Sequence, residues 1–219
     1  ANITTNGGNF TASANDMEIN AGINTGEGTI NIFRSSEGFL NLGDGDVNVQ
    51  EQAYGHLTLD GDELDNIDAR QMVFGRNNSD NNKVLELNVK DVELGDTDVT
   101  LNAFMDGHRF GDDVEFDGGT NTFGSLTANA GADIVFRNEA EVKTDDGNMI
   151  LTAGRDIKVR KANAPSTITS DQDIIFEASR IKIKDGTHVN SENLINFKAA
   201  TVNLDGDLDA PNITGNAAT

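Results

Sequence analysis

Closely spaced carboxylates are the residues of this sequence whose chemistry could serve a ligand. They form short acidic clusters at 44–46, 60–63, 112–113, 145–146 and 205–209. Ca²⁺ takes about six to eight oxygen ligands, so such clusters could bind it. None of them supplies both the glycine and the final glutamate of an EF-hand loop, and the Gly-rich nonapeptide of calcium-binding β-rolls is absent. The candidate calcium ligands therefore belong to no known calcium-binding motif, and they are Asp44, Asp46, Asp205, Asp207 and Asp209.

The same clusters have a simpler explanation as turns. Asp-Gly pairs recur at 44–45, 60–61, 117–118, 146–147, 185–186 and 205–206, and both residue types favour turns for conformational reasons. We expect turns to be their main role, with no cofactor required and calcium as the alternative.

Catalytic chemistry is not expected from this sequence. Two carboxylates could cleave a glycosidic bond, as in β-helical depolymerases, but sugar sites usually present aromatic platforms and the chain has no Trp and a single Tyr. His56, His108 and His188 share no metal-ligand spacing, and no serine elbow, phosphate loop or nucleotide fingerprint is present. We predict no catalytic residues, with a polysaccharide depolymerase or lyase as the alternative.

The charge of the chain restricts its partners. Its net charge is −21, with 6 basic and 23 acidic residues in 1–132 against 10 and 14 in 133–219. Phosphate binding needs clustered Lys and Arg, so we expect neither a basic patch nor nucleic-acid binding. The absence of Cys excludes disulfides and Cys-based metal sites, and no apolar run approaches the roughly 18 residues of a membrane span.

A three-residue motif, apolar-polar-Ala, recurs five times in the sequence. It predicts the strands that must carry these side chains. Its alanines fall at 103, 128, 153, 178 and 199, in steps of 25, 25, 25 and 21 residues. Period-two alternation indicates strands, and so short a repeat cannot bury a core alone, so the units must stack. We predict an all-β, parallel β-solenoid with one inward stack: Leu101, Leu126, Leu151, Phe176 and Phe197.

Each coil is expected to contain about three short strands, because further apolar triplets follow the alanines at 134–136, 157–159, 181–183 and 202–204. We predict one domain over 1–219, with regular coils over 99–210. Less regular, decorated coils are expected at about 60–98, where the apolar spacing at 63–67 indicates a helical turn. The alternative fold is an antiparallel sandwich, in which the Asp-Gly pairs would close hairpins.

The repeat phrases resemble those of filamentous-haemagglutinin-like bacterial exoproteins, the large adhesins of the two-partner secretion type. The resemblance is carried by the strand-turn-strand runs at 23–32, 57–75 and 149–157. It implies a right-handed parallel β-helix exported to the cell surface, where a long rod presents an adhesive region. It therefore implies an extracellular or bacterial cell-surface location, with a host or neighbouring cell as partner.

The two ends of the sequence read as further repeat. We find no capping pattern at 1–4 or at 210–219, whereas natural stacks cover their last coil. The expected neighbours are further solenoid coils of a longer chain. The alternative is a filament in which copies of the chain stack head to tail through a non-closing interface.

Overall fold

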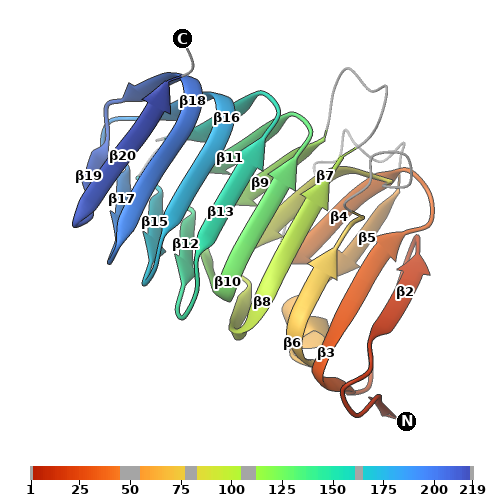
Figure 1. Ribbon diagram of the computed structural model, residues 1–219. Coiled ribbons are helices and arrows are strands. Elements are labelled where there is room, and N and C mark those ends of the chain that lie inside the picture. Colours follow the sequence, from red (N-terminus) through yellow and green to blue (C-terminus); the bar gives the residue numbers. More distant parts are fainter. Residues whose placement is uncertain (1, 45–54, 77–82, 105–111, 161–164, 218–219) are drawn as a thin grey trace.

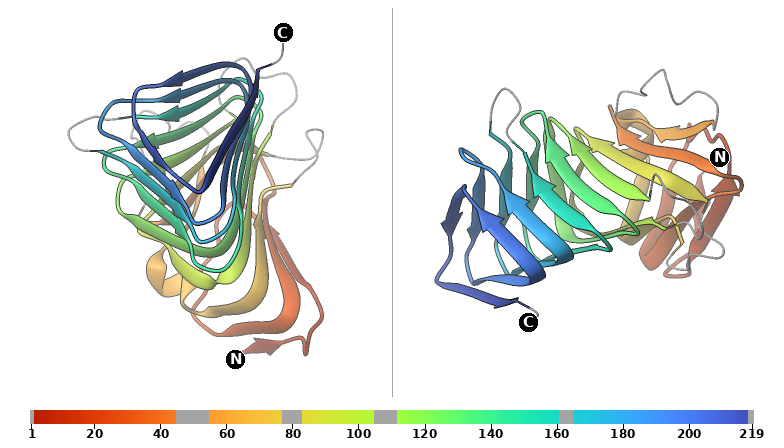
Figure 2. Two further views of the ribbon diagram at one scale, coloured as in Figure 1. Left: turned by 60° about the vertical axis from the view of Figure 1, so that its left-hand side comes forward. Right: turned by 90° about the horizontal axis from the view of Figure 1, so that it is seen from above.

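The chain forms a parallel β-solenoid of about eight turns, as Figures 1 and 2 show. The computed structural model describes residues 2–44, 55–76, 83–104, 112–160 and 165–217. Every strand pairing in these ranges is parallel, which confirms the solenoid and excludes the antiparallel sandwich.

Within these ranges, twenty strands and one short helix follow one another along the chain. Their bounds are β1 (Ile3–Thr4), β2 (Phe10–Ala14), β3 (Ile23–Arg34), β4 (Gly38–Gly43), β5 (His56–Leu59), α1 (Gly61–Leu64), β6 (Ile67–Phe74), β7 (Val84–Lys90), β8 (Glu93–Ala103), β9 (Asp113–Asp117), β10 (Thr120–Ala130), β11 (Asp133–Arg137), β12 (Glu141–Thr144), β13 (Met149–Ala153), β14 (Asp156–Val159), β15 (Thr167–Ser170), β16 (Ile174–Ile183), β17 (His188–Ser191), β18 (Leu194–Leu204), β19 (Asp207–Asp209) and β20 (Asn212–Ala217).

The pairings fall into three ladders that run along the rod. Ladder A joins β2, β3, β6, β8, β10, β13, β16, β18 and β20. Ladder B begins with β1 and the first residues of β3 and β6, and continues from β8 and β10 through β12, β15, β17 and β19. Ladder C joins β5, β4, β7, β9, β11 and β14 to the second parts of β16 and β18.

One large hydrophobic core fills the space between the ladders, and Phe39 and Leu85 form a small separate cluster. Alternate side chains of each strand point inward, so β13 buries Met149, Leu151 and Ala153 and leaves the two residues between them partly exposed. Equivalent aromatic side chains stack from coil to coil, as Phe176 does on Phe197 with ring centroids 5.2 Å apart. Burying one such side chain contributes about 1.5–3 kcal/mol, so the stability of the rod accumulates coil by coil.

The predicted inward stack is wrong at one position. Leu126 pairs with Val99 and Met149, whereas Ala128 pairs with Leu101 and Leu151. The column therefore contains Leu101, Ala128, Leu151, Phe176 and Phe197, and Leu126 lies buried in the adjacent column.

The physical reason is the sequence of β10, in which Leu126-Thr127-Ala128 and Ala128-Asn129-Ala130 both fit the repeated phrase. An offset of two residues keeps every side chain on the same face of a strand, so alternation cannot distinguish the two registers. The steps along the column are 27, 23, 25 and 21 residues. The equal steps of 25 residues in the sequence motif arose because one long coil is followed by one short coil.

The irregular region contains a strand that pairs out of chain order. Although β5 follows β4 in the sequence, it pairs with the N-terminal side of β4, opposite β7 (Figure 1). A helical turn follows, as expected, at α1. Its capping box joins Glu63 N to Asp60 Oδ1 at 2.9 Å and Asp60 N to Glu63 Oε2 at 3.2 Å.

Candidate functional site: the charged outer face of ladder C

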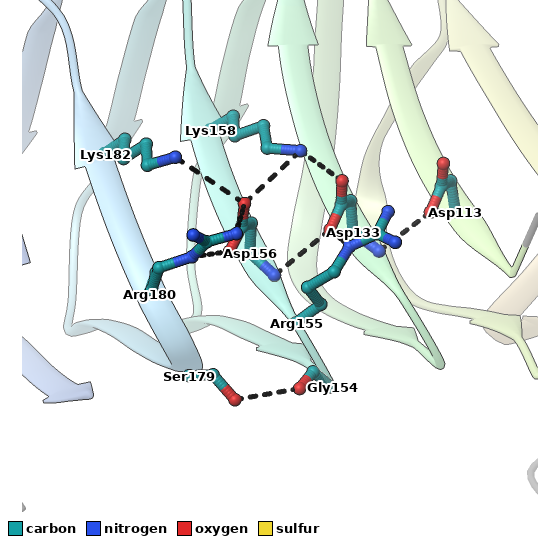
Figure 3. A network of polar contacts seen from close by, with 9 residues as sticks. All are labelled: Asp113, Asp133, Gly154, Arg155, Asp156, Lys158, Ser179, Arg180 and Lys182. Carbon is teal, nitrogen blue, oxygen red and sulfur yellow. Dashed lines mark hydrogen bonds and ion pairs between the residues drawn. The ribbon is translucent and has the colours of Figure 1, made fainter. Parts of the chain in front are cut away.

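The outer face of ladder C gathers charged side chains from five neighbouring strands: β7, β9, β11, β14 and β16. Ile157 and Ile181 are paired and buried in the core, so the residues on either side of them point outward. This alternation places Asp156 beside Arg180 and Lys158 beside Lys182 on the outside of the rod (Figure 3).

Asp133 is the first anchor of this face. Its side chain is 4% exposed and accepts a hydrogen bond from Arg155 Nε at 2.7 Å, one from Lys158 Nζ and one from the backbone N–H of Asp156 at 3.1 Å. Burial by itself would raise the pKa of Asp133, but the hydrogen bonds from the two cations outweigh it and the pKa is lowered. Asp133 is therefore a buried, ionised counter-ion.

Asp156 is the second anchor, one strand further along the rod. Its side chain is 2% exposed, and Arg180 binds it through two hydrogen bonds, Nε to Oδ1 at 2.6 Å and Nη2 to Oδ2 at 2.9 Å. Lys158 and Lys182 lie 3.5 Å and 3.8 Å from its Oδ2 atom. Burial favours a higher pKa, but the Arg180 hydrogen bond and nearby cations lower the pKa of Asp156.

Carboxylates dominate the same face toward the N-terminus. Glu86, Asp113 and Glu115 each place an oxygen within 4.8 Å of the others, which makes them the one group of potential metal ligands in the described ranges. Burial raises the pKa of both Asp113 and Glu115. Existing partners reduce the capacity of this group for a cation, because Arg137 Nη2 lies 2.5 Å from Glu115 Oε2 and the N–H of Asp133 donates to Asp113 at 2.8 Å.

The calcium candidates named from the sequence do not come together in the part of the chain that the structure describes. Asp44 is exposed just after β4, and Asp46 lies outside the described residues. Asp205 is exposed, as are Asp207 and Asp209 at the two ends of β19. The carboxylate of Asp207 lies beside a histidine, with His188 Nδ1 3.3 Å from its Oδ2.

No basic patch was expected from the sequence, and this expectation is wrong. Six of the sixteen Lys and Arg residues lie on or beside β14 and β16, and we call them the cationic strip: Arg155, Lys158, Arg160, Arg180, Lys182 and Lys184. They were missed because each strand contributes only three cations. The parallel pairing of β14 with β16 places the two groups of three side by side. The signal was visible as two short runs, 155–160 and 180–184.

Comparison with known proteins adds no relative. No family model, no curated protein and no solved structure matches this chain. None of the helices in the described ranges has the length and apolar character needed to cross a membrane. The class that the fold defines is therefore a parallel β-solenoid with a charged outer face.

Proposed function

We propose that the chain is an extracellular structural or adhesive rod, a β-solenoid segment of a large secreted or cell-surface adhesin. The observation that carries the proposal is the large hydrophobic core that continues through successive coils from Ile19 to Ala199. Such a stack gives length and stiffness without a central domain. The resemblance of the repeats to filamentous-haemagglutinin-like exoproteins supports the same role, with a right-handed rod of about three short strands per coil.

Antibody labelling of the source cells tests the location. An antibody raised against the purified chain should label intact cells, and permeabilisation should add little signal. Labelling that requires permeabilisation would contradict the proposal. Beads coated with the chain test adhesion, because they should attach to neighbouring or host cells more than beads coated with a neutral protein at equal density.

A filament subunit is the second candidate, and exposed apolar residues favour it. The large hydrophobic side chains that the described ranges leave exposed are Ile3 at 42%, Leu204 at 42% and Ile213 at 48%, which belong to β1, β18 and β20. β1, β20 and the second part of β18 are the outermost members of ladders B, A and C, so another coil, from the same chain or from a second copy, could cover them.

Light scattering of the purified chain separates these two candidates. The rod proposal expects 23.3 kDa particles. The filament alternative expects fibres that are lost in Ile213→Lys and retained in Ile175→Lys, because Ile175 lies in the middle of ladder A.

An acid-dependent depolymerase is the third candidate, and Glu86, Asp113 and Glu115 are the carboxylates that would serve it. Turnover of any polysaccharide in a panel of acidic and neutral chains, abolished by Glu115→Gln, would establish this activity in place of a purely structural role.

A further inference from the structure

We propose that the cationic strip on β14 and β16 binds a linear anionic polysaccharide, one that carries carboxylate or sulfate groups. The inference goes beyond the rod, since it depends on the six side chains of the strip and not on where the rod is displayed.

The strip carries an excess of positive charge in a strongly negative protein. Six cations face two buried counter-ions, Asp133 and Asp156, and two further carboxylates, Asp113 and Glu115, act on the strip from its N-terminal side, so the six cations still exceed these four anions by two. Arg160 and Lys184 are exposed and form no ion pair within the described ranges. A net charge of −21 makes this local excess unusual for the chain and favours a specific anionic ligand over general attraction.

The two anchors also hold the strip in place. Arg180 is fixed by two hydrogen bonds to Asp156, yet half of its side chain is exposed, at 50%, and Arg155 is 53% exposed while bound to Asp133. Side chains already ordered in the free protein lose less conformational entropy when a ligand binds. The exposed parts of these groups are thus available to an anion from solvent.

The spacing of the strip suits an extended chain. Alternate residues of a strand are about 6.6 Å apart and neighbouring strands about 4.8 Å apart, so the cations form two parallel rows. A hollow of about 180 Å³ lies where the rows end, lined by Lys158, Val159, Arg160, Lys182 and Lys184. An anionic chain lying along the strands would meet successive pairs of cations, with one acidic group entering the hollow.

A polysaccharide fits this surface better than a nucleic acid does. Duplex DNA carries one charge per roughly 1.7 Å, so its interaction with the rest of a −21 protein would be strongly repulsive. Single strands gain affinity by stacking bases on aromatic side chains, and the residues that line the hollow include no aromatic ring. The six residues of the strip are all cations, and none of them carries an aromatic ring.

The test uses the full 219-residue chain and defined oligomers. Fluorescence anisotropy with labelled polygalacturonate oligomers measures carboxylate binding, and labelled dextran sulfate oligomers measure sulfate binding. Neutral dextran and single-stranded oligothymidine complete the set. We expect at least one of the two anionic glycans to bind, neutral dextran not to bind, and affinity to fall as salt rises because exposed charges are screened.

The double variant Arg160→Gln/Lys184→Gln removes the two strip cations that do not hold the buried anchors, so the fold should persist by circular dichroism. Loss of two exposed ion pairs should weaken glycan binding about fivefold or more. The matched control is Lys143→Gln/Lys198→Gln, which makes the same charge change at exposed positions on ladders B and A.

Four results would overturn the proposal. The first is that neither glycan binds, and the second is that both double variants weaken binding equally. The third is that oligothymidine binds as tightly as the glycans. The fourth is that the strip variant abolishes a concentration-dependent self-association on which glycans have no effect. The last two would assign the strip to nucleic acid or to a second copy of the chain. Binding of only one glycan would support the proposal and identify the acidic group.

Discussion

Asp156→Asn is the substitution that most directly tests the electrostatics of ladder C. The carboxylate is 2% exposed and is the counter-ion of Arg180, Lys158 and Lys182. Removing one partner of a buried ion pair costs about 3–5 kcal/mol, and the partial exposure of these three cations places the expected loss near the lower end, about 3 kcal/mol. With a urea m-value of about 1–3 kcal/mol/M, the unfolding midpoint should fall by roughly 1–3 M at pH 7.

The pH dependence of this loss follows from the lowered pKa of Asp156. A carboxyl whose pKa is lower in the folded than in the unfolded state contributes stability above its unfolded pKa, near 3.8, and loses it as the pH falls through the folded pKa. The difference between wild type and Asp156→Asn should therefore be full at pH 7 and shrink below pH 3.8.

Asp185→Asn is the matched control, because Asp185 is exposed in a turn. Its effect should stay within about 0.5 kcal/mol. Urea unfolding followed by circular dichroism at pH 7 and in acid measures both variants. Equal losses in the two variants, or an Asp156→Asn loss that persists undiminished in acid, would refute the reasoning.

Three further predictions concern the core, the acidic end of ladder C and calcium. Phe176→Ala removes a fully buried ring stacked on Phe197, so urea unfolding should show a loss of about 3–5 kcal/mol. Asp113→Asn should stabilise the fold at pH 7, because burial raises the pKa of Asp113 and its charge opposes folding there. That gain should disappear below the unfolded pKa, near 3.8, in thermal melts. If the acidic clusters are turns, a chelator should leave the melting temperature unchanged, and a large drop would reveal an occupied site.

The sequence contained enough information for the architecture but not for the register. Alternation and a repeat of twenty-odd residues require stacked parallel strands, and the helical turn near Leu64 followed from apolar spacing. The choice between Leu126 and Ala128 depends on the length of the connection between β8 and β10. Alternation has a period of two and cannot detect a shift of two, so only the three-dimensional pairing decides it.

The candidate site was harder to predict for a related reason. Glu86 and Asp113 are 27 residues apart and become neighbours through the β7–β9 register. Lys158 and Lys182 are brought together in the same way, by β14 and β16. A scan for acidic or basic runs along the chain sees neither group, because a solenoid assembles its surface across coils. Aligning the runs 155–160 and 180–184 by their apolar residues would have revealed the strip.

The out-of-order strand β5 affects how the rod can assemble and resist force. Elsewhere a coil can dock as soon as its own twenty-odd residues are available, which favours stepwise folding along the chain. The first coil differs, because its place in ladder C is filled by His56–Leu59, which are synthesised after β4. The first two coils are therefore complete only after β5 has docked on β4, which we expect to add a loop-closure cost that later coils do not have. A pull on the N-terminus should first release β1 and β2, which the described pairings join to β3, whereas β5 should stay bound until β4 itself is removed.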